Sequence, residues 1–169
     1  MGRVIVVDED DVVVGFKERS ELSADDIGRK SVLWITNSQG QVLLTLRSSK
    51  KATASGKWSA AVAGTVDEGE DYESNIIKEA SEEIGLAISR SDLRPGSKVR
   101  VKTKQSNHFA QWYTCSIDRA CEDFVLQEDE VSAIKWVDPT ELSRMLERDP
   151  DQFVPTAPLW RTLGLIPPL

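Results

Sequence analysis

The segment from Gly64 to Leu86 constrains the fold more than any other part of the 169-residue chain. It opens with a loop over 65–70 that is rich in glycine and acidic residues. Apolar side chains then recur every three or four residues, which predicts a helix over 72–84 that buries one face. Gly85 follows where a helix commonly ends on a glycine. The apolar positions are Ile76, Ile77, Ala80 and Ile84.

The predicted helix carries three carboxylates, Glu79, Glu82 and Glu83, at spacings of three and four residues. Such spacings place side chains together on one side of a helix, where like charges repel. A hard cation such as Mg²⁺ or Mn²⁺ would relieve that repulsion, because oxygen ligands suit such ions. The alternative from composition alone is a solvated acidic face, which is common in acidic proteins.

The flanking sequence alternates irregularly between strands and helices. Residues 31–36 and 41–46 surround a turn ending in Gly40, which predicts a β-hairpin. A second helix is expected over about 139–147, because Asp138 is a good N-cap and proline follows it. Further strands are predicted over 3–7, 12–16, 98–104, 109–117 and 132–137, and a short apolar stretch covers 58–63. This order favours an α+β fold with a mixed sheet rather than a doubly wound parallel sheet.

Length and composition indicate one domain, 1–169, that can form a core without disulfides or metals. A proline-rich apolar tail over about 153–169 is expected to dock on the body. Lys and Arg total 21 and Asp and Glu total 28, a net charge of −7. This balance argues against binding to nucleic acid or to an anionic membrane surface, but not against phosphorylated substrates, since bound cations invert the local field. We expect a cytoplasmic protein in which Cys115 and Cys121 are reduced.

The whole 23-residue pattern over 64–86 resembles the Nudix box, G-x5-E-x7-R-E-U-x-E-E-x-G-U, in which U is a bulky aliphatic residue. Two positions depart from it, since Lys78 stands in place of the usual arginine and Ala80 in place of a larger aliphatic residue. Lysine lacks the bidentate fork of arginine. The matching residues are Gly64, Glu70, Glu79, Glu82, Glu83, Gly85 and Leu86.

This resemblance implies a Nudix-type sandwich, with a mixed β-sheet packed between α-helices and the box forming a loop–helix–loop. Glu79, Glu82 and Glu83 would bind Mg²⁺ or Mn²⁺ and help to position or deprotonate water. The carbonyl of Gly64 would add a metal ligand. Glu70 and Lys78 would hold the geometry of the loop and helix.

Weaker motifs lie on both sides of the box, among them Leu44-Thr45-Leu46-Arg47-Ser48 and Trp58 before it and 126–131 and Trp136 after it. Together they resemble the isopentenyl-diphosphate isomerase-like branch of the superfamily. Isomerase activity itself is disfavoured, because Ala63 and Thr65 replace the cysteine and histidine of that enzyme's pattern and neither shuttles a proton at neutral pH. Its early His-Arg pair also reads Gly28-Arg29 here.

Members of that branch that hydrolyse diphosphates are the better match. The predicted reaction is attack of water on a nucleoside diphosphate linked to another moiety, or on a similar small metabolite. Arg29, Arg47 and Lys51 are candidates for phosphate contact, although ordinary exposed cations are equally compatible.

Acidic residues before the strand over 132–137 supply a further candidate ligand or base, for which Glu130 is favoured over Glu128. The only histidine, His108, is a candidate ligand or proton relay, against a simple strand-end residue. A homodimer and a ligand-binding Nudix module with weak catalysis also remain open.

Overall fold

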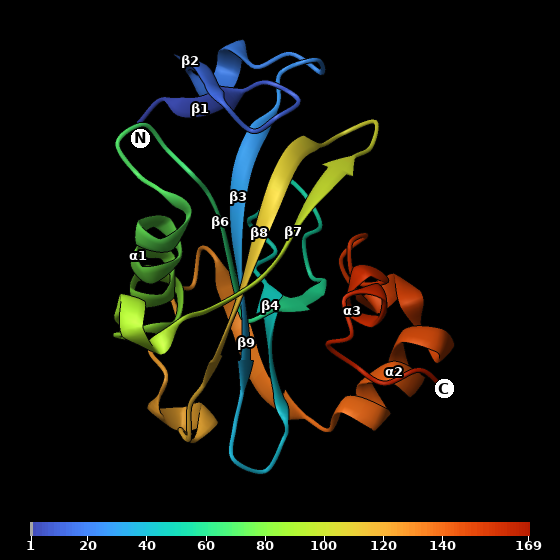
Figure 1. Cartoon of the computed structure of the whole chain (residues 1–169). Coiled ribbons are helices and arrows are strands. Elements are labelled where there is room, and N and C mark those ends of the chain that lie inside the picture. Colours follow the sequence, from blue (N-terminus) through green and yellow to red (C-terminus); the bar gives the residue numbers. More distant parts are fainter. Residues whose placement is uncertain (1) are drawn as a thin grey trace.

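The computed structural model describes residues 2–169, which form a mixed β-sheet with helices on both sides (Figure 1). Helix α1 (Tyr72–Ile84) covers one side, and α2 (Pro139–Arg148) and α3 (Leu159–Thr162) cover the other. This is the α+β arrangement predicted from the sequence. The sheet is built from β3 (Gly28–Thr36), β4 (Val42–Arg47), β5 (Trp58–Ala60), β6 (Val62–Thr65), β7 (Arg94–Lys102), β8 (Asn107–Ser116) and β9 (Val131–Val137).

The predicted hairpin of β3 and β4 is correct only at its turn, where Thr36 pairs with Val42. Beyond that pair the two strands diverge, and β5 and β6 fill the gap between them. β6 pairs antiparallel with β3, and β5 pairs antiparallel with β4. On their other edges, β3 pairs with β8 in parallel and β4 pairs with β9. The end of β6, where the box begins at Gly64, is therefore paired with β3.

Helix α1 has the predicted bounds because both of its ends carry the expected caps. The side chain of Asp71 accepts a hydrogen bond from Ser74 N, and Gly85 adopts a left-handed conformation with φ of 64°. A Cβ at position 85 would lie 2.8 Å from Val125 Cβ, so glycine is also required sterically. Ile76 and Ile84 are fully buried in a core shared with β3 and β8.

The C-terminal tail docks on the opposite side of the sheet, as predicted. Trp160 is 1% exposed, and its ring packs edge-on against Trp34 and Phe153, with centroids 5.3 and 5.9 Å apart. Aromatic pairs of this geometry add to the apolar area that the tail buries. Within the described residues, no helix is long and apolar enough to cross a membrane.

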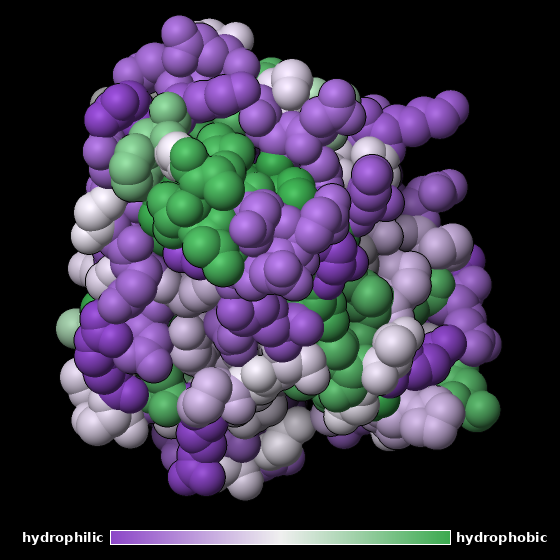
Figure 2. Space-filling model, turned by 45° about the horizontal axis from the view of Figure 1, so that its top comes forward, coloured by the Kyte–Doolittle hydropathy of each residue, from purple (hydrophilic) through white to green (hydrophobic). Residues whose placement is uncertain are grey.

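An N-terminal hairpin of β1 (Val4–Val7) and β2 (Val13–Lys17) forms a separate two-stranded sheet at the top of Figure 1. β1 is buried, whereas β2 exposes large apolar side chains. Figure 2 shows an apolar patch on the face that contains this end of the molecule. The exposed large apolar side chains of this region are Val12, Val13, Val14, Phe16 and Leu22.

Candidate active site

The candidate site forms where β6 leads into the loop before α1. Gly64 lies directly against the side chain of Glu79, because a Cβ built on Gly64 would approach Glu79 Cδ to 2.7 Å and Oε1 to 2.8 Å. Only glycine leaves room for this carboxylate. The backbone of β6 and the first predicted metal-binding side chain are therefore in contact.

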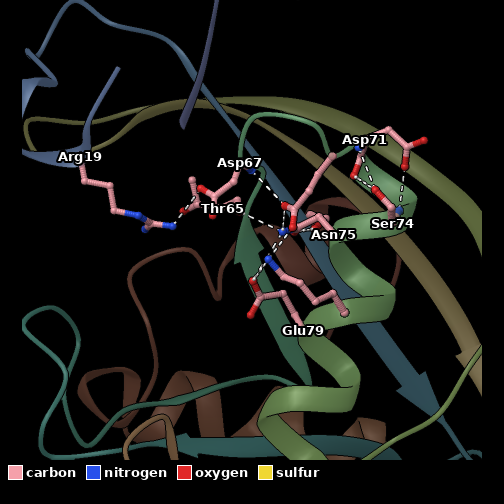
Figure 3. A network of polar contacts seen from close by, with 10 residues as sticks. Arg19, Thr65, Asp67, Asp71, Ser74, Asn75 and Glu79 are labelled. Atoms are coloured by element: carbon pink, nitrogen blue, oxygen red, sulfur yellow. Dashed lines mark hydrogen bonds and ion pairs between the residues drawn. The ribbon is translucent and has the colours of Figure 1, made fainter. Parts of the chain in front are cut away.

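Glu70 and Lys78 tie this loop to the helix. They belong to the polar network in which Figure 3 labels Asp67, Asn75 and Glu79. Lys78 Nζ donates to Glu70 Oε1 at 2.5 Å, and Asp67 N donates to Glu70 Oε2 at 3.0 Å. Burial raises the pKa of Glu70, but the hydrogen bonds from Lys78, Asp67 N and Asn75 outweigh it, so the pKa lies below its usual value. Lys78 therefore joins the loop to the helix through Glu70, and its Nζ also lies 3.9 Å from Glu79 Oε1.

Asn75 is a central member of this network that the sequence interpretation missed. Its side chain is fully buried, and Nδ2 donates to Thr65 O and to Glu70 Oε2, both at 2.9 Å. Its Oδ1 accepts a hydrogen bond from the buried hydroxyl of Ser31 on β3. The available signal was a polar residue beside Ile76, on the side of the helix that packs against the sheet.

The three box carboxylates have different environments. Glu82 is exposed, whereas Glu79 and Glu83 are partly buried. Glu79 Oε1 is turned towards the start of the helix, 3.5 Å from Asn75 Nδ2 and 3.9 Å from Lys78 Nζ. Burial raises the pKa of Glu79, and the carboxylates of Glu82, Glu70 and Glu130 raise it further, against Lys78.

Glu83 is influenced by two carboxylates, Glu79 one helical turn before it and Glu130 from a segment that is distant in sequence. Burial first, then the charges of Glu79 and Glu130, raise its pKa to about 8. Glu130 is held in place by Lys51, whose Nζ lies 2.5 Å from Glu130 Oε2. Glu128 is exposed. The structure therefore brings Glu130, and not Glu128, to the box carboxylates.

The donor set suits a hard divalent cation. As the side chains lie, no group of three His, Cys, Asp or Glu residues within 2–169 is close enough to hold a metal ion. However, Glu79 and Glu83 lie four residues apart on α1, so rotation about their side-chain bonds can bring the two carboxylates together. The close contact of Gly64 with Glu79 and the grouping of oxygen donors fit Mg²⁺ or Mn²⁺.

The predicted phosphate-binding cations are placed differently from one another. Arg47 donates to the carbonyl of Thr53, and Lys51 pairs with Glu130 near Glu83. Arg29 is instead held by Asp11, with Nε 2.6 Å from Oδ1, and its guanidinium lies over the ring of Tyr72. That ion pair fastens the N-terminal hairpin loop to β3, and the hydroxyl of Tyr72 joins the same carboxylate to α1, which leaves Arg29 less free for a ligand.

Lys30, the neighbour of Arg29, was not predicted. Adjacent strand residues face opposite sides of a sheet, so Lys30 points away from the side where Arg29 meets α1. Burial lowers the pKa of Lys30, and the charges of Arg47, Arg19 and Lys51 lower it further. The charged groups that act on Lys30 are therefore themselves positively charged.

A cavity of about 400 Å³ lies beside Lys30, between residues 22–30 and the turn that joins β7 to β8. Its lining includes Gly28, Thr65 and His108, which are positions where this chain departs from the isomerase pattern or bears its only histidine. Burial, then the charges of Lys30 and Arg100, lower the pKa of His108 to about 4. His108 is therefore neutral at physiological pH.

Comparisons with known proteins agree with this geometry. A family model described as the NUDIX domain matches residues 28–157. The isopentenyl-diphosphate Delta-isomerase of Klebsiella pneumoniae is 29% identical over 90% of this chain and 84% of its own length. The prenyl-diphosphate phosphatase of Methanosarcina mazei is 31% identical over 88% of this chain and 86% of its own length.

Among solved structures, a Deinococcus radiodurans protein superposes with a TM-score of 0.79 and 26% identity, covering 95% of this chain and 98% of that one. The match therefore extends beyond the box into both the N-terminal hairpin and the C-terminal tail. The chain belongs to the NUDIX family, in its isopentenyl-diphosphate isomerase-like branch.

Proposed function

We propose that the protein is a divalent-metal-dependent hydrolase that cleaves the diphosphate of a small metabolite, such as a nucleoside diphosphate linked to another moiety. The observation that carries the proposal is the grouping of Gly64, Glu79, Glu83 and Glu130, from three separate parts of the chain. Grouping carboxylates in a partly buried place costs desolvation and repulsion energy, so such groups occur chiefly where they bind a cation.

Each residue has a distinct role in the proposed reaction. Glu79, Glu82 and Glu83, with the carbonyl of Gly64, hold the cation, which neutralises phosphate oxygens and lowers the pKa of water when bound. Glu130 lies beside Glu83 and is placed to orient or deprotonate the attacking water. Water attacks phosphorus, the bridging P–O bond breaks, and the bridging oxygen leaves with the second product.

Two cations, Lys51 and Arg47, complete the proposed site. Lys51 is held by Glu130, and Arg47 has no carboxylate partner within the described part of the chain. Both are within electrostatic range of Glu83. They are placed to contact the phosphate oxygens that the metal does not bind.

Isomerisation of a prenyl diphosphate is the less favoured reaction. It requires one group to protonate an alkene and another to remove a proton. Ala63 has no such group and the hydroxyl of Thr65 does not titrate near neutral pH. The similarity to a prenyl-diphosphate phosphatase supports hydrolysis in this branch.

The test is phosphate release from nucleoside diphosphates, nucleoside diphosphate sugars and prenyl diphosphates with Mg²⁺ or Mn²⁺. Glu83→Gln should lower kcat by about 10²–10⁴-fold, as should a chelator. Glu73→Gln is the matched control, because Glu73 lies on the same helix but pairs with Arg90. Tight ligand binding without turnover would instead identify a binding module, and conversion of isopentenyl diphosphate to its isomer would overturn the proposal.

A further inference from the structure

Lys30 is a partly buried cation without a partner of opposite charge. It lies in the interior of the sheet, where β3 pairs Lys30 with Thr65 on β6 and with Ala110 on β8. The charged groups that act on it are Arg47, Arg19 and Lys51, and within residues 2–169 it forms no ion pair with a carboxylate. An unpaired charge in such a place is destabilising unless an anion from outside completes it.

The same cations link Lys30 to the box carboxylates. Arg47 and Lys51 are within electrostatic range of Lys30 and also of Glu83. Lys51 is neutralised by Glu130, whereas Lys30 and Arg47 are not neutralised by any described carboxylate. Two of the cations whose charges act on Lys30 therefore also act on a carboxylate of the predicted metal site.

Lys30 also forms part of the wall of the 400 Å³ cavity. That volume lies within the usual range for small-molecule sites, about 300–1,000 Å³. Apolar atoms, including those of Val4 and Leu22, supply slightly more than half of the exposed wall, but most lining side chains end in hydroxyl, amide or charged groups. These polar side chains include Ser23, Asp26, Thr103, Gln105, Ser106 and Asn107.

We infer that Lys30 binds the phosphate of the substrate that lies farther from the box carboxylates, and that the cavity holds a polar, hydroxyl-bearing group attached to that phosphate, such as the sugar of a nucleoside diphosphate. This inference rests on the proposed function and names its substrate class. An ammonium group offers three donors to phosphate oxygens. A prenyl chain in the cavity would desolvate polar side chains without giving them hydrogen bonds.

The first experiment removes the charge with Lys30→Met and restores it with Lys30→Arg. Lys135→Met is the matched control, because Lys135 is also a partly buried strand lysine whose pKa burial lowers, but it lies over the ring of Trp58. Binding of methylenediphosphonate with Mg²⁺ present is measured by calorimetry. Lys30→Met should weaken binding about tenfold, equivalent to about 1.4 kcal/mol, Lys30→Arg should recover most of it, and Lys135→Met should leave it unchanged.

Kinetics with the best substrate of the panel add a readout that a purely structural lysine would not move. Lys30→Met should raise KM about tenfold with kcat little changed, and its unfolding midpoint should equal or exceed that of the wild type, because the unpaired charge is gone. Unchanged binding and KM in Lys30→Met would overturn the role of Lys30.

The second experiment fills the cavity with Ala24→Trp, since Ala24 is an exposed lining residue. This variant should raise KM for UDP-glucose at least tenfold, by roughly the same 1.4 kcal/mol, and leave methylenediphosphonate binding unchanged. If geranyl diphosphate is hydrolysed better than UDP-glucose and Ala24→Trp has no effect on either reaction, the inference of a polar group in the cavity is overturned. Diphosphonate binding that depends on Lys30, without hydrolysis of any substrate, would refute the proposed function and retain the anion site.

Discussion

The buried pair of Asn75 and Ser31 gives a stability prediction whose size follows from its contacts. Asn75→Ala removes two donated hydrogen bonds, to Thr65 O and Glu70 Oε2, and the acceptor of the Ser31 hydroxyl. A net hydrogen bond contributes about 1 kcal/mol, and a buried group left unpaired costs about 1–3 kcal/mol. Because Ser31 is fully buried, we expect a loss of about 3 kcal/mol of unfolding free energy.

Urea unfolding followed by circular dichroism measures this loss. With a urea m-value of about 2 kcal/mol/M, the midpoint should fall by about 1.5 M. Ser31→Ala alone should cost less, because Asn75 keeps both of its donated bonds. The double variant should show a coupling energy of about 1 kcal/mol, since the two side chains share one contact. A loss below about 1 kcal/mol for Asn75→Ala would refute this reasoning, because it would mean that the network contributes little.

Three further predictions follow from caps, burial and the box network. Gly85→Ala should lower the unfolding free energy by about 2–3 kcal/mol, whereas Gly164→Ala, with a similar φ but open space, should cost only about 1 kcal/mol in the same urea titration. The pKa of His108 in the folded protein lies below its unfolded value of about 6.5, so the unfolded chain takes up the proton first as pH falls. Between pH 6.5 and 4, the wild type should therefore lose up to about 3 kcal/mol of unfolding free energy relative to His108→Gln. Parallel pH profiles of the two proteins would contradict this. Lys78→Met should lower the unfolding free energy by about 1 kcal/mol and lower kcat, because Glu70 loses its ion pair. Lys78→Arg should keep the stability and the kcat of the wild type. Equal kcat in the two variants would count against the supporting role of Lys78.

The box helix could be predicted to the residue because its determinants are local. Its apolar period, the cap at Asp71 and the left-handed Gly85 all lie within the segment itself. The β3–β4 hairpin could not be predicted beyond its turn, because pairing depends on which distant strands compete for the same edges. β5 and β6 take those edges once the two strands diverge, and nothing in the local alternation of residues 31–46 indicates it.

The same distinction holds for the candidate site. The spacing of the box singled out Glu79, Glu82 and Glu83, since helical neighbours are set by sequence separation. It could not separate Arg29 from Lys30, because adjacent strand residues face opposite sides and the sequence does not say which side is occupied. The difference between the two cations comes from a loop that is distant in sequence, where Asp11 pairs with Arg29. Lys30 is left without a carboxylate partner in the described part of the chain.

The register between β3 and β6 explains how the helix and the unpaired lysine are fixed relative to each other. Ser31 pairs with Gly64, so the hydroxyl that anchors Asn75 and the glycine that receives Glu79 lie at the same level of the sheet. Lys30 is one residue away and therefore faces the other side. A slip by one residue would place the lysine against α1 and turn the Ser31 hydroxyl away from Asn75. The Ser31–Asn75 bond thus favours the register in which Ser31 and Gly64 face α1 and Lys30 faces the opposite side of the sheet.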